Sequence, residues 1–271
     1  MRVLDPLFGQ RDLYVNLTLR ELRGKYKRSA LGWAWSLLNP LATMAIFSVV
    51  FRFFLKVEIP AGDPSGLHVF AFFLLCGLLP WNAASAGITG GMGSLLGNAN
   101  LINKVFFPRE LLVAANTTSV SISLLIELGV LVAALLVAGS MVLPWLPLVA
   151  LVVVVQALFV YGLALLLSVA AVYFRDIQHL VGIALQLWFY ATPIVYPRAL
   201  AVDALADQPL LRWLYEANPM LRFVAIYRDV LYDLRGPELG DVLAVLAATV
   251  VSLAVGLAVF RRLEPRLAEE L

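Results

Sequence analysis

Charged residues are scarce in this sequence. Only 14% of its 271 residues are Asp, Glu, Lys or Arg, whereas 62% are hydrophobic. A soluble domain of ordinary composition carries roughly 25% charged residues. This excludes a water-soluble fold for most of the chain, and a net charge of +2 gives no indication of a nucleic-acid partner. We expect a single membrane domain.

Cysteine is nearly absent. Cys76 is the only one, so neither an intrachain disulfide nor a cysteine cluster for a metal can form. Its apolar neighbours in FFLLCGLLP predict a buried and unreactive thiol. Residues 1–29 also lack the apolar core of a signal peptide, so we expect no cleavage there.

Motifs that carry chemistry are missing as well. The sequence has no GxxxxGK[ST] phosphate loop, no HExxH zinc pair, no GxSxG elbow and no carboxylate cluster at the end of a hydrophobic run. We therefore predict no catalytic site, no metal and no cofactor in this chain. Any ATP that drives its activity, together with the Mg²⁺ of that ATP, would be bound by a partner subunit.

Long apolar runs are abundant instead. A hydrocarbon core of about 30 Å requires about 20 apolar residues in a helix, and runs of this length exclude the short alternating strands of a membrane barrel. The sequence predicts an all-α membrane protein with six transmembrane helices. We place them at Leu31–Leu55, Val69–Ile88, Leu112–Ala138, Leu148–Val172, Ile177–Val195 and Val242–Phe260.

The positions of basic residues predict the orientation. Short loops rich in Lys and Arg stay in the cytoplasm, and such residues precede the first run, follow the second and follow the last. We therefore place both termini in the cytoplasm. The residues are Arg11, Arg20, Arg23, Lys25, Lys27 and Arg28, then Lys104 and Arg109, then Arg261, Arg262 and Arg266.

Two further segments show helical periodicity. In residues 1–30, Val15, Leu19, Leu22 and Tyr26 predict an amphipathic helix on the inner leaflet, where each basic residue adds about 1 kcal/mol of attraction to anionic lipid. Residues 197–240 form a long external segment, in which helical spacing predicts an amphipathic helix at the outer interface. Ordinary packing against the bundle is the alternative for both helices. The external spacing is carried by Met220, Val224, Tyr227, Leu231 and Leu234.

Two motifs lie near the inner end of the second run. GITGGMGSLLG (87–97) pairs Gly87 with Gly91 and Gly93 with Gly97 at small-xxx-small spacing, which favours close helix packing. Residues 98–110 begin with cap-type residues and reach Pro108, which predicts about two helical turns on the cytoplasmic side. A short helix there could transmit force from a soluble partner.

One carboxylate lies inside a predicted span. A charge at this depth costs roughly 2.5–3.5 kcal/mol on insertion scales, so Glu127 requires a partner. We predict an intramembrane ion pair with Arg52. A proton relay is the alternative, although the neighbouring spans offer no further titratable group at an obvious depth.

Aromatic side chains gather in the first and fifth runs. They are suited to interfacial belts or to a passage for sugars, because a ring offers an apolar face and a hydrogen-bonding edge. The members singled out here are Trp35, Phe47, Phe51, Trp188, Tyr190 and Tyr196.

Four motifs together resemble a known family. They are LRELRGKYKRSALGWAWSLLNPL (19–41), NLINKVFFPRE (100–110), YFRDI (173–177) and WFYATPIVYP (188–197). In sequence and order they are similar to the permease subunits of polysaccharide and polyol-phosphate ABC exporters, and the resemblance spans essentially the whole chain.

The resemblance implies an assembly. Two copies of the chain would form a channel lined by the six aromatics named above, with residues 197–240 as an outer gate and 31–271 as one transmembrane domain. Two copies of a cytoplasmic ATP-binding subunit would dock beneath. The implied docking residues are Leu101, Ile102, Lys104, Val105, Phe106, Phe107, Arg20 and Arg23.

The family's substrates are lipid-linked polysaccharides such as O-antigens, capsule precursors, teichoic acids and cell-wall galactan. Two other functions stay open. An ABC permease for a drug or a lipid would share this topology, and a membrane-embedded transferase acting on lipid-linked sugars would need carboxylates at an interface. The cytoplasmic connections between spans offer only Glu110 and Asp176 for that role.

Overall fold

The structure is a computed structural model that describes residues 6–25, 34–50, 61–105 and 107–267. These residues form helices and loops and no strand. Four helices are long and apolar enough to cross a membrane, which confirms four of the six predicted spans. They are α3 (Phe70–Gly97), α5 (Glu110–Val137), α6 (Leu146–Tyr173, extended at its start by η2, Leu143–Trp145) and α11 (Leu239–Leu263).

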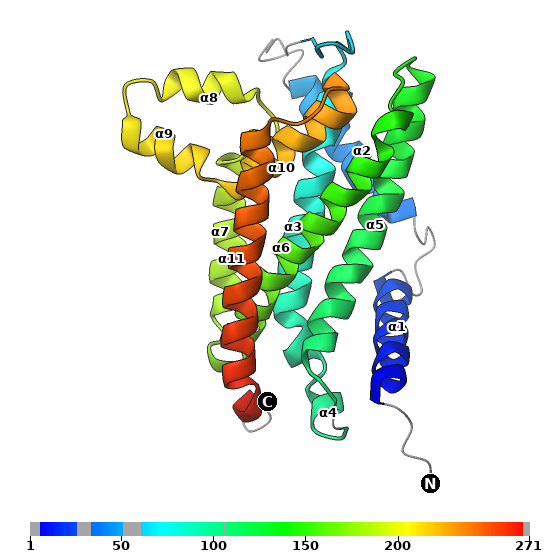
Figure 1. Cartoon of the computed structure of the whole chain (residues 1–271), viewed down its shortest axis with the longest axis vertical. Coiled ribbons are helices and arrows are strands. Elements are labelled where there is room, and N and C mark those ends of the chain that lie inside the picture. Colours follow the sequence, from blue (N-terminus) through cyan, green and yellow to red (C-terminus); the bar gives the residue numbers. More distant parts are fainter. Residues whose placement is uncertain (1–5, 26–33, 51–60, 106, 268–271) are drawn as a thin grey trace.

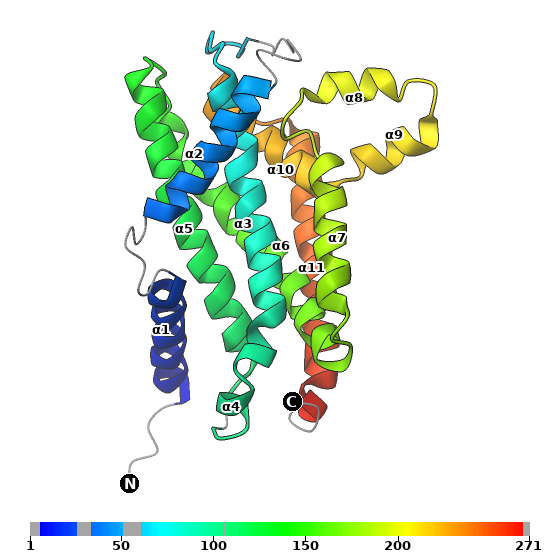
Figure 2. The ribbon, with the colours of Figure 1, turned by 180° about the vertical axis from the view of Figure 1, so that it is seen from behind.

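The remaining two predicted spans coincide with shorter helices. α2 (Ala34–Val49) packs against α3 and α5 and lies obliquely over them in Figure 2. Residues 51–55 of its predicted span lie outside the described residues. α7 (Ile177–Tyr190) ends five residues before the predicted Val195. Pro193 explains the difference, because proline lacks the N–H that would continue the helical hydrogen bonds.

Glycines allow the spanning helices to approach closely. A Cβ atom added at Gly256 of α11 would lie 2.1 Å from the carbonyl oxygen of Gly162 on α6, so the two backbones touch. The predicted packing role of Gly87 and Gly91 is confirmed, because added Cβ atoms would lie 2.7 Å from Val160 and 2.6 Å from Ala164. The structure shows no such packing at Gly93 and Gly97, where an added Cβ would meet none of the described residues within 4 Å.

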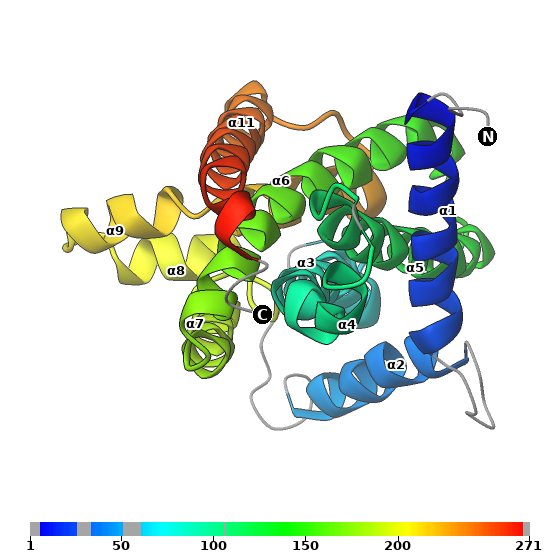
Figure 3. The same ribbon diagram turned by 90° about the horizontal axis from the view of Figure 1, so that it is seen from below.

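The N-terminal helix α1 (Pro6–Lys25) packs on α5 and is seen lengthwise across it when the bundle is viewed from below (Figure 3). The hydroxyls of Tyr14 and Thr118 are 2.6 Å apart. This contact turns Leu17 and Leu22 into the bundle and leaves Val15 and Leu19 exposed. Of the predicted apolar face, Leu22 therefore packs on the bundle, whereas Val15 and Leu19 do not.

The connection from α3 to α5 contains less helix than expected. α4 (Ala99–Ile102) is a single turn rather than two. In Figure 1 it lies at the same end of the bundle as the start of α1 and the end of α11. The guanidinium of Arg109 donates to the carbonyl of Glu264, and the Arg109 N–H donates to Oε1 of Glu264 at 3.3 Å. The start of α1, α4 and the end of α11 therefore lie at one end of the molecule.

The opposite end carries the long external segment. α8 (Arg198–Ala204) and α9 (Pro209–Glu216) form a hairpin that projects sideways from the bundle (Figures 1 and 2). α10 (Pro219–Arg228) and η3 (Asp229–Asp233) return into it, where Met220, Val224, Tyr227 and Leu231 are buried. The interfacial prediction was wrong for this helix, and the packing alternative is confirmed, because its apolar side faces α3 and α11.

The glycine contact between α6 and α11 yields a stability prediction. Gly256→Ala must push the two helices apart, and overpacking of this kind costs about 1–3 kcal/mol. We expect a lower thermal midpoint in detergent, measured by fluorescence-detected size-exclusion chromatography. Gly129→Ala is the matched control, because a Cβ there meets nothing within 4 Å. Equal midpoints for the two variants would contradict the close approach.

Candidate functional site

The C-terminal end of α7 is the most densely bonded polar region of the described chain. Pro193 ends the helix, so the carbonyls of the following turn require other donors. Two side chains from the α10 segment supply them. The guanidinium of Arg228 donates to the carbonyls of Pro193 and Ile194, both at 2.6 Å, and the Asn218 amide donates to the Ala191 carbonyl at 3.1 Å.

Arg228 also fixes this turn to α3. Its guanidinium lies 3.6 Å from the centre of the Phe73 ring, an arrangement in which a cation is attracted to the ring face. Gly77 leaves room for it, since an added Cβ there would lie 3.2 Å from the Arg228 Nη2 atom. Arg228 is only 8% exposed. A buried cation satisfied by carbonyl groups therefore joins α3, α7 and α10.

Asn218 organises the start of α10. Its Oδ1 accepts a hydrogen bond from the Met220 N–H at 2.9 Å, which caps the helix. Pro219 occupies the first helical position, where a residue without an N–H leaves no donor unpaired. The same oxygen accepts from Nε1 of Trp188 at 2.7 Å. Trp188 also packs edge-on against Trp81, with ring centroids 5.7 Å apart. Its ring is thus half-buried in contacts within the chain.

Four charged side chains tie the α8–α9 hairpin to the bundle. We call them the ion knot: Arg198, Glu216, Arg222 and Asp241. Arg222 donates to Glu216 Oε2 at 2.8 Å and to Asp241 Oδ1 at 2.6 Å, and Arg198 pairs with Glu216. Asp241, in the first turn of α11, is only 2% exposed. Its charge therefore depends on these cations.

The loop before α3 closes over η3. The Tyr232 hydroxyl donates to the Leu67 carbonyl at 2.8 Å, and the Asp233 carbonyl accepts from the Ser65 N–H at 3.0 Å. η3 ends at Leu234, whose φ of 63° is left-handed and unfavourable for a residue with a branched side chain. Burial raises the pKa of the adjoining Asp229, and a 2.7 Å hydrogen bond from Arg235 opposes that shift.

The predicted channel aromatics are distributed unequally. Trp35 on α2 is 40% exposed and Tyr190 on α7 is 63% exposed, although the Tyr190 ring packs edge-on against Phe189, with centroids 5.2 Å apart. The Tyr196 hydroxyl donates to the Tyr190 carbonyl at 2.8 Å. Phe47 lies within α2, and its side chain is outside the description, as is the whole of Phe51.

α7 carries a polar stripe that the sequence analysis missed. His179, Gly182, Gln186 and Tyr190 recur every three or four residues, so they share one face of the helix, and all four are exposed. Leu185 is the only buried residue of α7. The signal for this stripe is the spacing of polar residues within the hydrophobic run.

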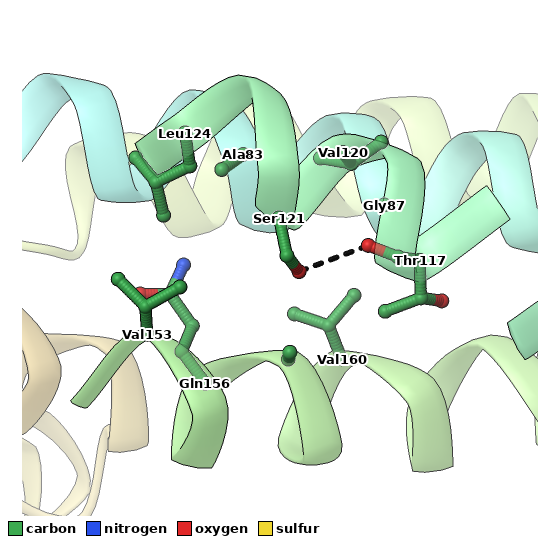
Figure 4. Close-up of a pocket in the computed structure, with 10 residues that line it drawn as sticks. Ala83, Gly87, Thr117, Val120, Ser121, Leu124, Val153, Gln156 and Val160 are labelled. Carbon is green, nitrogen blue, oxygen red and sulfur yellow. Dashed lines mark hydrogen bonds between the residues drawn. The ribbon is translucent and has the colours of Figure 1, made fainter. Parts of the chain in front are cut away.

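Inside the bundle, α3, α5 and α6 enclose a cavity of about 10 Å³ (Figure 4). Gln156 projects toward it and is 2% exposed. Its Nε2 donates to the Pro80 carbonyl at 2.7 Å, whereas its Oε1 has no partner among the described residues. A space of this size holds about one water molecule. This cavity is therefore no passage for a sugar chain.

Glu127 lies near Lys25, and its predicted pairing with Arg52 stays a prediction. It is 9% exposed and interacts electrostatically with Lys25, the last residue of α1. The Lys25 ammonium donates to Ser123 at 3.2 Å, one turn before Glu127. Arg52 lies outside the described residues. Lys25 was assigned to the basic cytoplasmic cluster, because its helix was expected on the leaflet surface rather than against α5.

The predicted docking residues lie around α4. Lys104 and Val105 are exposed, the latter at 51%, whereas Ile102 and Phe107 are buried and Leu101 is half-buried. Phe106 lies outside the description. Arg20 and Arg23 are exposed on α1, and Arg20 donates to Asn98 at 2.7 Å immediately before α4. The structure thus brings Arg20 and the α4 turn together.

The chain belongs to the ABC-2 type transporter family, whose model matches residues 13–232. It is similar to the O-antigen export system permease protein RfbA of Myxococcus xanthus, with 30% identity over the whole of both chains. RfbA of Klebsiella pneumoniae is also 30% identical, over 95% of this chain and 94% of its own. The polysialic acid transport protein KpsM of Escherichia coli is 26% identical over 92% of each chain.

The ion knot yields a second prediction. Arg222→Gln or Asp241→Asn alone leaves a buried charge with fewer partners, and we expect each to lower stability by about 2 kcal/mol. The double variant should lose less than the sum of the two, because the pair is removed together. Arg212→Gln, on exposed α9, serves as control. Thermal midpoints of the purified proteins measure this, and simple additivity would argue against the coupling.

Proposed function

We propose that this chain is the membrane subunit of an ATP-driven exporter of lipid-linked polysaccharide in a bacterial inner membrane. Two observations support the substrate class: the relatives named for O-antigen and polysialic acid export, and the four motifs noted in the sequence. ATP and Mg²⁺ are bound by two copies of a cytoplasmic partner, since the sequence holds no phosphate loop. Both termini and α4 face that partner.

The polar stripe on α7 is the observation that carries the proposal. An exposed amide or imidazole in a membrane helix is unfavourable against lipid and normally faces protein or water. Within one chain, the side chains of His179, Gln186 and Tyr190 are exposed, so this face of α7 is open to a partner. A second copy placed opposite α7 would enclose the stripe around an aqueous path. The channel then lies between two chains rather than within one.

The aromatics take different roles in this arrangement. Trp35 and Tyr190 offer exposed rings and, with Phe47 and Phe51, form the proposed lining on which sugar rings slide. Trp188 supports the wall from behind, because its indole is held by Trp81 and Asn218. Tyr196 lies where α7 turns into the outer gate, which comprises residues 197–240 and is held by Arg228 and the ion knot.

The residues proposed for docking of the ATPase fall into two groups: exposed residues that contact the ATPase and buried residues that hold the α4 turn in place. Lys104, Val105, Arg20 and Arg23 are exposed and available to the partner, whereas Ile102 and Phe107 anchor the α4 turn in the bundle. Leu101 and Phe106 complete the proposed surface. Arg20 links α1 to Asn98, so movement of the ATPase would reach both elements together.

The first functional prediction concerns ATP. The chain purified alone should hydrolyse no ATP. Co-expression with the ATP-binding subunit from its own gene neighbourhood should yield a complex with two copies of each chain, by mass photometry. Val105→Asp should weaken that complex by placing a charge in the contact, whereas Val137→Asp, at a 90% exposed position at the end of α5, should not. ATP turnover by the pure chain would contradict the proposal.

The second concerns the stripe. Gln186→Leu should lower glycan export at least about tenfold at an unchanged membrane level, because a leucine removes the hydrogen-bonding group from an aqueous wall. Leu187→Ala is the control on the neighbouring apolar stripe. Surface glycan in a strain lacking the native gene is measured by immunoblot. Normal export by the Gln186→Leu variant would indicate that this face of α7 lies against lipid. If the wild-type protein exports a drug or a lipid but no glycan, the alternative of a drug or lipid permease is favoured.

A further inference from the structure

The connection after α4 is fixed to the end of α11 by two residues that cap each other's helices. Arg109 lies immediately before α5, and Glu264 lies immediately after α11. The Arg109 guanidinium donates to the main-chain carbonyl of Glu264, and the Glu264 carboxylate accepts from the Arg109 N–H at 3.3 Å. We call this pair the reciprocal cap.

The reciprocal cap satisfies both helix ends. The last carbonyls of a helix have no partner within the helix and carry partial negative charge, which a cation stabilises. The first N–H groups have no acceptor and carry partial positive charge, which a carboxylate stabilises. The Glu264 carbonyl also accepts from the Leu267 N–H, so both of its lone pairs are used. Because each charged side chain acts on the other helix, removal of either one loosens both ends.

An apolar cluster joins the same elements. Ile102 of α4 and Phe107 of the following connection are buried in this cluster together with Phe260 and Leu267 from the end of α11. α6 contributes Leu165 to it. Packed interiors have low compressibility and transmit displacement instead of absorbing it. The α4 turn and the end of α11 are therefore held together by polar and apolar contacts at once.

The connection continues from α11 to α6. The two backbones touch at Gly256 and Gly162, and the Ser252 hydroxyl, one turn before Gly256, donates to the Phe159 carbonyl at 2.7 Å. Every residue of α7 is described, and none belongs to the apolar cluster at the α4 end. A displacement of the α4 turn would therefore move α11 and α6 relative to α7.

We propose that Arg109 is a positioning residue for transport: through the reciprocal cap it makes α11 and α6 follow the α4 turn when the ATPase moves. This inference rests on the proposed function, in which the ATPase docks at the α4 turn and the glycan passes along α7. The ATPase then acts on the path through two helices that it does not contact within the membrane. Without the reciprocal cap, the α4 turn moves alone and the stroke is lost.

Substitution of the cap donor is the first arm of the test. In the complete complex, Arg109→Ala should lower glycan export about tenfold, within the range of couplings between sites, while ATP turnover stays close to that of the wild type. Arg109→Lys should recover most of the export, because an ammonium can also donate to the Glu264 carbonyl. Arg262→Ala is the matched control, since Arg262 is exposed in the last turn of α11 and makes no hydrogen bond to the described residues. Equal export by Arg109→Ala and Arg262→Ala would overturn the proposal.

A covalent replacement of the cap is the second arm. In a variant that combines Arg109→Cys with Glu264→Cys, the two thiols can be joined by a short bifunctional methanethiosulfonate, because the single native cysteine, Cys76, is fully buried. The unjoined variant should export poorly, the joined variant should regain export, and a reducing agent should reverse the gain. Joined elements can move as one body but cannot separate. Further loss of export on joining would show that they must separate, and would overturn the proposal.

The readouts distinguish the possible failures. If the wild-type complex hydrolyses ATP but exports no glycan, the proposed function is wrong and the coupling falls with it. If the wild type exports normally but Arg109→Ala loses the ATPase subunit on purification, or loses export and ATP turnover in proportion, Arg109 serves docking or folding and the coupling is refuted. Support requires an intact complex, retained ATP turnover, reduced export and recovery in the joined variant.

Discussion

The contact on which the outer half of this molecule depends is that between Arg228 and the turn after α7. A proline ends the helix and leaves carbonyls inside the protein, and a guanidinium from another segment occupies the space beside them. Neither group would be stable there alone, because unpaired buried polar groups and charges are both costly. Their pairing sets the direction in which the chain leaves α7, and hence the position of the α8–α9 hairpin.

Around this contact the structure combines two kinds of cohesion. Near Arg228, side-chain hydrogen bonds and the ion knot connect α8 and α9, which bury no residue of their own, to α10 and α11. Within the bundle, glycines bring the backbones of α6 and α11 into contact and let side chains of α6 pack closely on α3. The polar contacts near Arg228 depend on charge and are local. The glycine packing depends on the shapes of the helices and extends along them. The proposed path between two copies lies along α7, which takes part least in either.

The sequence predicted the spanning helices best, since long apolar runs leave few alternatives in a membrane. It also indicated the glycine packing, although spacing alone could not tell Gly91, which packs on Ala164, from Gly97, where an added Cβ would meet no described residue within 4 Å. Long-range pairings could not be predicted. Lys25 reaches Glu127 only because α1 lies against α5, and Arg228 reaches residue 194 only after α10 turns back into the bundle. Hydropathy carries no information on either.

The crossing of α6 and α11 at Gly162 and Gly256 has a mechanical consequence. Ridges of side chains can slide or rotate past one another by changing rotamers, but two backbones in contact have no such freedom. α6 and α11 must therefore move together as one rigid body. Any widening of the molecule during transport has to be taken up at its loosely attached perimeter, where α7 is fastened to the rest mainly at its outer end.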